Sequence, residues 1–354
     1  MMPAIEKPHV GAGFTTSQVS DAKRARIARL DKHYVGFSRD RLLRDTLRSM
    51  VDSIPPNDYD QLDIPDKRRI VAICGESGAG KTRALIEHCH RIPEMRPYVD
   101  HDQVLVNPVL WFKAPSPSTS QRLAFAGLTA LGVPVRANIA ENKIWQLFQT
   151  ELKSHRIRFV VIDEAQDAIE TANRIEIVKI ANAFKNLVQM QDWSLRLVLV
   201  GVPPLAEFLE RKQLFNRRLV VPFERISADA EVGTVVTILE KVVVDHAGMT
   251  LAKDLGDDFE KRLAHACDGQ IGSIIQIVRK ALEFAIEGEE EQLTLTHFAN
   301  AYRSFSGCKD DENIFEADHW RDLDPFTALR RDGDLNYIVA RSTASKSRSA
   351  TRRA

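Results

Sequence analysis

The sequence predicts an α/β fold: a five-stranded parallel sheet, followed by a small all-helical domain. Three observations support this prediction. An apolar, β-branched run at 70–74 leads into a glycine-rich loop and then into a helix-forming segment. As far as residue 226, apolar strand patterns alternate with amphipathic helix patterns, which is typical of a parallel sheet with right-handed crossovers. From residue 227 to about residue 306, only helix patterns follow.

The glycine-rich loop matches the phosphate-binding pattern G-x-x-x-x-G-K-T; it reads Gly75-Glu76-Ser77-Gly78-Ala79-Gly80-Lys81-Thr82. Its glycines allow a tight turn that brings backbone N–H groups close to phosphate oxygens. The helix expected over 83–90 points its positive dipole end at the same phosphates. We expect these eight residues and Arg83 to bind the nucleotide. Lys81 would reach the β- and γ-phosphates, and the Thr82 hydroxyl would bind Mg²⁺.

The remaining chain is organised around this loop. Further strands are expected at 109–113, 158–162, 195–200 and 219–223. The expected domains are a flexible N-terminal arm (1–30), the α/β core with its leading helix (31–226), a helical lid (227–306) and a tail (307–354). The tail is first acidic with isolated aromatic residues and then rich in serine and arginine, so we expect it to be largely extended or disordered. The basic helix pattern at 18–29 has either a solvated face or a face that lies on a DNA backbone.

Composition sets the broad class. The 354 residues include 49 basic and 49 acidic ones, so the chain is not a polycation, although a local basic patch is compatible with this balance. The four cysteines form no C-x-x-C pair, which suits a reducing compartment. The sequence contains no apolar run near the roughly 18 residues of a membrane span and no signal-peptide pattern. We therefore expect a cytoplasmic protein with no membrane partner.

A second motif for nucleotide chemistry ends the predicted strand Phe159-Val160-Val161-Ile162, which is followed by Asp163-Glu164. Downstream of a phosphate-binding loop, this pattern indicates a Walker B motif, whose two carboxylates have different tasks. Asp163 would hold Mg²⁺ together with Thr82, and Glu164 would orient or deprotonate the attacking water. Glu164 and Lys81 are therefore the catalytic residues expected within one subunit.

Residues beside the last two strands could take part in ATP hydrolysis. The strand at 195–200 ends in Gly201-Val202, where the strand between the two Walker motifs normally presents Asn, Thr or Ser. Arg217 and Arg218 precede the last strand, where an arginine can stabilise the γ-phosphate bound by a neighbouring subunit. A pair of surface arginines is an equally good interpretation, and the sequence favours Arg218 over Arg217 only slightly.

A turn rich in proline and hydroxyl residues lies between Lys113 and Arg122. Hydroxyl and basic groups bind phosphate without reading sequence, so four residues are candidate contacts to a DNA backbone: Lys113, Ser118, Thr119 and Arg122. The alternative is a plain loop, in which Ser118 or Thr119 caps the next helix. His88-Cys89-His90 suggests a metal site, but positions one and two apart on a helix do not share a face, so we expect these residues to be structural.

Missing motifs narrow the class of P-loop protein. The chain has no N-K-x-D motif that reads guanine, which favours ATP over GTP, and no L-S-G-G-Q motif of transporter cassettes. Asp163-Glu164-Ala165-Gln166 resembles a helicase DEAQ box, but a helicase needs a second α/β lobe, and the rest of this chain is helical. An ATPase core with a helical lid remains, which is the arrangement of AAA+ proteins.

Several stretches between Leu30 and Phe305 share their pattern with one family. They are the helix ahead of the phosphate-binding loop, the loop itself, Val109-Leu110-Trp111-Phe112-Lys113-Ala114-Pro115, Leu128-Thr129-Ala130-Leu131-Gly132-Val133-Pro134, Val161-Ile162-Asp163-Glu164-Ala165-Gln166, Arg217-Arg218 and Gly269-Gln270-Ile271-Gly272. On these residues the sequence resembles the TniB/TnsC-type AAA+ ATPases, which regulate DNA transposition. Many ATPases share the two Walker motifs, whereas the A-L-G-x-P turn and the G-x-I-G stretch are more specific.

The resemblance implies a prokaryotic ATPase that forms a ring or filament on duplex DNA, with contacts mainly to the backbone. It implies that this assembly links a target-selection protein to a transposase, and that ATP hydrolysis takes the assembly apart. Lys113 and the Ser118–Thr119 turn would face the DNA, and a peptide around Asp324-Pro325-Phe326 would bind a partner protein. Val202 at the strand tip, and Ser273 where a sensor arginine would stand, imply slow hydrolysis. The alternative is a P-loop switch in signalling or secretion that binds proteins and not DNA.

Overall fold

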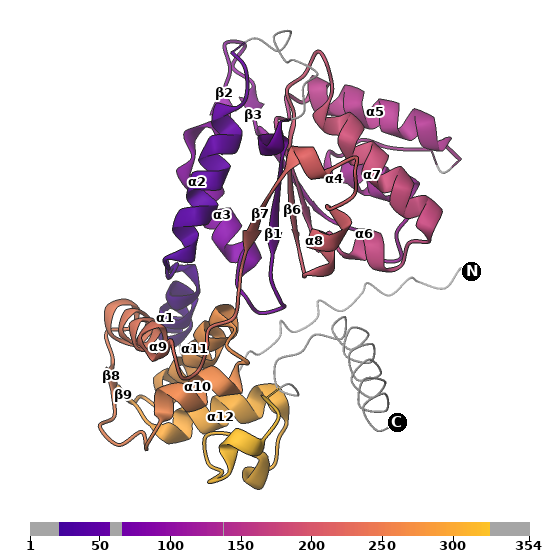
Figure 1. Ribbon diagram of the computed structural model, residues 1–354. Helices are drawn as coiled ribbons and strands as arrows, with labels where there is room; N and C mark the ends of the chain where they lie inside the picture. The colour runs from indigo at the N-terminus through magenta and orange to yellow at the C-terminus, as the bar shows by residue number, and fades with distance from the viewer. Residues whose placement is uncertain (1–20, 57–65, 137, 326–354) are drawn as a thin grey trace, which may run out of the picture.

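The structure is a computed structural model that describes residues 21–56, 66–136 and 138–325. Figure 1 shows two lobes, one built around a parallel sheet and the other made almost entirely of helices. Among the described residues, no helix is both long and apolar enough to cross a bilayer.

The predicted five-stranded parallel sheet is confirmed. Its strand order is β4-β5-β6-β1-β7, and every neighbouring pair is parallel. The strands are β1 (Ile70–Cys74), β4 (Val109–Lys113), β5 (Phe159–Asp163), β6 (Arg196–Gly201) and β7 (Arg218–Pro222). Each lies within one residue of its predicted bounds. β1 and β5 are buried along their whole length, as expected for parallel strands covered on both faces.

Helices cover both faces of the sheet (Figure 1). They are α2 (Arg39–Asp52), α3 (Lys81–Arg91), α4 (Ser120–Ala130), α5 (Glu141–Ser154), α6 (Asp167–Glu170), α7 (Arg174–Val188) and α8 (Pro204–Phe208). A short antiparallel hairpin, β2 (Tyr98–Val99) and β3 (Leu105–Val106), lies between α3 and β4 in the sequence.

One strand serves two hydrophobic cores, because successive side chains point to opposite faces of a sheet. In β1, Val71 and Ile73 pack in the core that contains the apolar residues of α2 and α3. Ala72 and Cys74 pack in the core on the other face, with the apolar residues of α4, α5 and α7. The phosphate-binding loop at the end of β1 is therefore anchored from both sides of the sheet.

The helical lobe contains α9 (Val232–Leu239), a π-helical segment (Glu240–His246), α10 (Phe259–Ala266), α11 (Ile271–Glu287) and α12 (Leu295–Ser306). α11 buries nine of its 17 residues. Two-residue strands, β8 (Thr250–Leu251) and β9 (Gln292–Leu293), also form a parallel pair in this lobe. The sequence did not predict this pair, because two residues are too few to show a strand pattern.

The described part of the predicted flexible arm is a packed helix. α1 (Asp21–Lys32) lies against α11, and its Leu30 is buried in the core of the helical lobe. Lys23 Nζ donates to the Glu287 carbonyl oxygen (3.0 Å), and Arg26 Nη2 donates to the Ala247 carbonyl oxygen (3.1 Å). Flexibility is therefore the wrong prediction for the end of the arm, since basic side chains hold it to the lobe. Residues 1–20 lie outside the described part.

The acidic and aromatic segment after α12 is also packed, not extended. Its Phe315 and Trp320 side chains are buried in the core of the helical lobe. Arg262 of α10 donates to three backbone carbonyls within 314–317. The prediction of an extended tail is wrong for the described part, because these anchors outweigh the acidic composition. Residues 326–354, which include the last residue of the predicted docking peptide, lie outside the described residues.

Candidate nucleotide-binding site

The loop at 75–82 connects β1 to α3, and the structure explains why glycine is needed at three of its positions. Gly78 and Gly80 have positive φ angles of +79° and +86°, a region that favours glycine. At Gly75, a Cβ atom would lie 2.4 Å from the Phe223 carbonyl oxygen. α3 begins at Lys81, directly after Gly80, so its unpaired N-terminal N–H groups face the loop. The backbone can therefore cradle phosphate groups.

Lys81 is buried inside this loop. Its Nζ donates to the carbonyl oxygens of Gly75 (2.7 Å) and Glu76 (2.9 Å). Phosphate oxygens can replace these two carbonyls as acceptors, and the gain is that a negatively charged acceptor takes the place of a neutral one.

Thr82 and Asp163 meet as predicted. The Thr82 hydroxyl donates to the Asp163 carboxylate, at 3.2 Å from each of its oxygens. Burial raises the pKa of Asp163 above its usual range, against hydrogen bonds from the Glu164 N–H and the Thr82 hydroxyl. Mg²⁺ prefers hydroxyl, carboxylate and water oxygens, so these two side chains fit the predicted metal position.

Glu164 is held by a residue that the sequence did not assign to the site. Glu164 has a positive φ of +49°, and Gln166 Nε2 donates to its carboxylate oxygen Oε2 (2.8 Å). Gln166 Oε1 accepts from the Val202 N–H (3.3 Å) at the tip of β6. The Gln166 side chain therefore lies beside the strand tip where Val202 lacks a polar side chain. The D-E-A-Q pattern contains this residue, but in the sequence it indicates family resemblance and does not reveal a partner for Glu164.

The helical lobe rests directly on the phosphate-binding loop. The Ser273 N–H, in the first turn of α11, donates to the Gly78 carbonyl oxygen (3.0 Å). A Cβ atom at Gly272 would lie 2.4 Å from the same oxygen. The second glycine of the G-x-I-G stretch therefore has a steric reason: it lets the start of α11 approach the loop.

Arg39, the first residue of α2, supports the loop from another side. Its Nη2 donates to the Ala79 carbonyl oxygen (2.6 Å), and its guanidinium lies over the Phe223 ring, 4.4 Å from the centroid. Burial lowers the pKa of Arg39. No local pattern could mark this contact, because 40 residues separate Arg39 from Ala79.

Two side chains predicted to bind the nucleotide are engaged with the protein. Arg83 Nη2 donates to the carbonyl oxygen of Lys32 (2.6 Å), at the end of α1. The Glu76 carboxylate lies 3.9 Å from Arg225, which also forms an ion pair with Asp268 (2.8 Å) of the helical lobe. Both contacts connect the loop region to the helical lobe.

Arg217 and Arg218 lie at the amino-terminal end of the parallel strands, whereas the phosphate-binding loop lies at their carboxyl-terminal end. Arg218 is in register with Ile70, the first residue of β1, whereas the loop follows Cys74. Arg217 is buried, and its Nη1 donates to the Gln213 carbonyl oxygen (3.0 Å). Arg218 Nε donates to the Leu209 carbonyl oxygen (2.8 Å), and its side chain is 16% exposed. The structure therefore leaves more of Arg218 open to a partner than of Arg217.

The four candidate DNA contacts divide into two pairs. Ser118 is buried, and Thr119 caps α4, with its hydroxyl accepting from the Arg122 N–H (3.2 Å). The Ser118 hydroxyl is therefore not available at the surface, whereas a DNA contact of Thr119 stays a prediction, because a hydroxyl that accepts from an N–H can still donate to a phosphate. Lys113 and Arg122 are exposed, although Arg122 also donates to the Pro117 carbonyl oxygen (3.0 Å). Lys113 ends β4 in register with Asp163, so it lies at the carboxyl end of the strands, where the phosphate-binding loop also lies.

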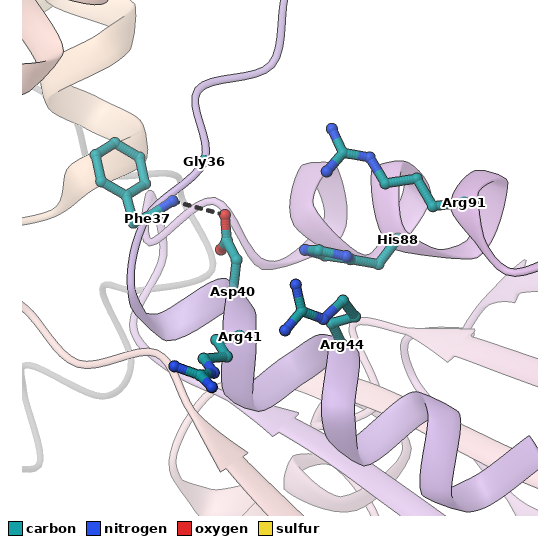
Figure 2. A pocket seen from close by; sticks show the side chains of 7 residues that line it. All are labelled: Gly36, Phe37, Asp40, Arg41, Arg44, His88 and Arg91. Atoms are coloured by element: carbon teal, nitrogen blue, oxygen red, sulfur yellow. Dashed lines mark hydrogen bonds between the residues drawn. The ribbon is translucent and has the colours of Figure 1, made fainter.

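A separate cavity of about 370 Å³ lies between α2 and α3 (Figure 2). His88 lines it, together with Asp40 and the arginines Arg41, Arg44 and Arg91. His88 is 3% exposed, and neither ring nitrogen has a hydrogen-bond partner among the described residues. Burial lowers the pKa of His88. His90 is exposed, so the two imidazoles do not share a face of α3, as predicted.

Comparisons with known proteins agree with this geometry. The family model described as "Bacterial TniB protein" matches residues 38–226, more than half of the 354 residues. No curated protein matches the sequence. Cdc6p from Pyrobaculum aerophilum has a similar structure, with a TM-score of 0.54 and 15% identity over 78% of this chain and 70% of that chain. ORC1 from Aeropyrum pernix, in complex with DNA, has a TM-score of 0.54 and 19% identity over 81% of this chain and 70% of that chain.

At such low identity, the likeness to these two structures concerns the fold alone, which is the AAA+ fold. The fold, the phosphate-binding loop and the Walker B carboxylates are those of a nucleotide-binding AAA+ protein. The family match begins beside α2 and ends after β7, so it spans both Walker motifs. The chain belongs to the TniB family and has the AAA+ P-loop fold.

Proposed function

We propose that this protein is an ATP-dependent regulator of DNA transposition. It assembles with further copies of itself on duplex DNA and links a target-selection protein to a transposase in the bacterial cytoplasm. Slow ATP hydrolysis takes the assembly apart. The observation that carries the proposal is that the phosphate-binding loop and Arg218, the two proposed halves of an ATPase site, lie at opposite ends of the parallel strands.

The separation of the two halves supports assembly. Along β1 and β7, four residue steps separate the pair Ile70–Arg218 from the pair Cys74–Pro222. At about 3.3 Å per residue, this is roughly 13 Å. The Arg218 guanidinium, already turned toward the Leu209 carbonyl oxygen, is thus remote from the phosphates of its own chain. A neighbouring copy can receive it instead, and the bound ATP then stabilises the contact between the two copies.

The chemistry within one chain follows from the four residues at the loop. Lys81 binds the β- and γ-phosphates after it exchanges its two carbonyl acceptors for phosphate oxygens. Thr82 and Asp163 would hold Mg²⁺, which when bound neutralises charge on the phosphates. Glu164 orients the attacking water and takes its proton. The arginine from the neighbouring copy stabilises the charge that develops on the γ-phosphate.

Duplex DNA is the proposed surface on which copies assemble. The A. pernix ORC1 neighbour is described in complex with DNA, and family membership points to DNA transposition. Lys113 and Arg122 are exposed basic residues that flank the predicted contact turn in the sequence. Contacts to phosphates are sequence-independent and release counterions, so binding should weaken steeply as salt rises.

Assembly on DNA tests the proposal. Wild-type protein with a non-hydrolysable ATP analogue should form large complexes on duplex DNA of arbitrary sequence, visible by gel filtration and electron microscopy. Lys81→Ala should abolish them, and Glu164→Gln should make ATP-dependent complexes persist. Monomer alone, at low salt with analogue and DNA, would refute assembly. Assembly that is indifferent to DNA and to salt would instead favour a switch that binds only proteins.

A further inference from the structure

A chain of hydrogen bonds connects the phosphate-binding loop to the catalytic carboxylate. The Gly75 N–H donates to the Gly201 carbonyl oxygen (3.2 Å) at the end of β6. The next residue, Val202, donates its N–H to Gln166 Oε1 (3.3 Å), and Gln166 Nε2 donates to Glu164 Oε2 (2.8 Å). β6 lies between β1 and β5 in the sheet, so its tip is the only part of the described sheet between the two Walker motifs.

From this arrangement we propose that Gln166 is a positioning residue for ATP hydrolysis. Its amide holds the Glu164 carboxylate with its donor end and the β6 tip with its acceptor end. Gln166 thereby supplies the polar group that Val202 lacks, and it connects Glu164 to the loop that binds phosphate. This inference rests on the proposed ATPase function and adds a residue to it.

The surroundings fix the orientation of Gln166. The residue is buried, with 8% of its surface exposed, and its backbone carbonyl accepts from the N–H groups of Ile169 (2.8 Å) and Glu170 (2.9 Å) in α6. A Cβ atom at Gly201 would lie 2.6 Å from Gln166 Oε1. The absence of a side chain at position 201 is therefore what allows the amide to reach the strand tip.

The amide is suited to this task because its two ends differ. A glutamine can donate to a carboxylate and accept from an N–H at the same time, whereas a glutamate can only accept. Gln166→Glu keeps the bond from the Val202 N–H, removes the bond to Glu164 and brings a second negative charge beside it. Gln166→Ala removes both bonds.

Steady-state ATP hydrolysis on DNA tests the inference with matched variants. We expect Gln166→Ala and Gln166→Glu to lower kcat by about 10–100-fold, the usual effect of losing a residue that orients an active-site group, with KM changed less than threefold. Gly201→Ala should reduce kcat through displacement of the intact glutamine. Thermal unfolding checks that each variant is folded.

A double-mutant cycle separates positioning from a general structural role. In a Glu164→Gln background, Gln166→Ala should cause no further loss of kcat, because the group that it orients is gone. A full additional loss in that background, or wild-type kcat in Gln166→Glu, would overturn the inference. If the wild type itself hydrolyses no ATP in the presence of DNA, the proposed function fails, and that outcome is distinct from a failure confined to the Gln166 variants.

Discussion

Gly272→Ala is the most direct perturbation of the contact between the helical lobe and the phosphate-binding loop. The new Cβ atom would lie 2.4 Å from the Gly78 carbonyl oxygen and 2.9 Å from the Gly80 backbone nitrogen. Ordinary contact begins near 3.4 Å, so α11 and the loop must separate by about 1 Å. Because both neighbours are backbone atoms, no side-chain rotation can relieve the clash.

The cost can be assembled from its parts. A shift of this size breaks the 3.0 Å hydrogen bond from the Ser273 N–H to Gly78, worth about 0.5–1.5 kcal/mol. Overpacking of a close contact typically costs about 1–3 kcal/mol. The higher helix propensity of alanine returns about 0.5–1 kcal/mol. The expected net destabilisation is about 0.5–4 kcal/mol, with a middle value of about 2 kcal/mol, and at about 2–4 °C per kcal/mol this middle value corresponds to a fall in Tm of roughly 4–8 °C.

Gly233→Ala is the matched control in the same lobe. Gly233 lies in α9, and a Cβ atom there would meet nothing within 4 Å. The control should therefore leave Tm unchanged or raise it slightly. Differential scanning calorimetry of the wild type and the two variants measures the difference. Equal Tm values for Gly272→Ala and Gly233→Ala would refute the close packing of α11 on the loop.

Three further outcomes are expected. Arg218→Ala and Lys81→Ala should each be inactive in ATP hydrolysis, yet their mixture should recover part of the activity, because one chain supplies the loop and the other the arginine; an inactive mixture would contradict a site shared between copies. Because burial lowers the pKa of His88, the folded chain binds fewer protons than the unfolded chain below the ordinary value of about 6.5, so stability is lost as pH falls through that value. Calorimetry at pH 7.5 and 5.5 should show a smaller fall in Tm for His88→Gln than for the wild type, whereas the exposed His90→Gln should behave like the wild type. Arg262→Ala should expose the segment at 314–317 to limited proteolysis, because it removes the donor to three carbonyls, and unchanged cleavage would show that the aromatic anchors suffice.

The sheet and most helices could be predicted because their signals are local. The strand at 109–113 was predicted with its observed bounds, and the Thr119 cap of α4 follows from a hydroxyl residue ahead of an amphipathic run. The Thr82–Asp163 contact could also be predicted. Asp163 ends one parallel strand and Thr82 follows another, and the carboxyl ends of parallel strands lie on the same side of a sheet.

Composition gave a wrong prediction for the segment after α12, where a few buried side chains decide whether the chain is packed. The segment after α12 has many acidic residues, which favours disorder, but Phe315 and Trp320 bury enough apolar surface to hold it. The sequence shows both aromatic residues, but it does not show that a hydrophobic core lies where they can pack. That core is built from helices between α9 and α12, and its shape depends on their packing.

The contacts that could not be predicted converge on the phosphate-binding loop from distant parts of the chain. Arg39 binds the carbonyl oxygen of Ala79, Ser273 binds that of Gly78, and the end of β6 binds the Gly75 N–H. A shift of the loop on phosphate binding would therefore change the energy of contacts made by α2, by the helical lobe and by the segment that holds Glu164. Coupling of this kind is reciprocal. If bound nucleotide changes the equilibrium between two positions of the lobe or of the β6 tip by some factor, then a change from one position to the other alters the nucleotide affinity by the same factor. An assembly contact that shifts α11 would thus be measurable as altered ATP affinity, even if it lies far from the loop.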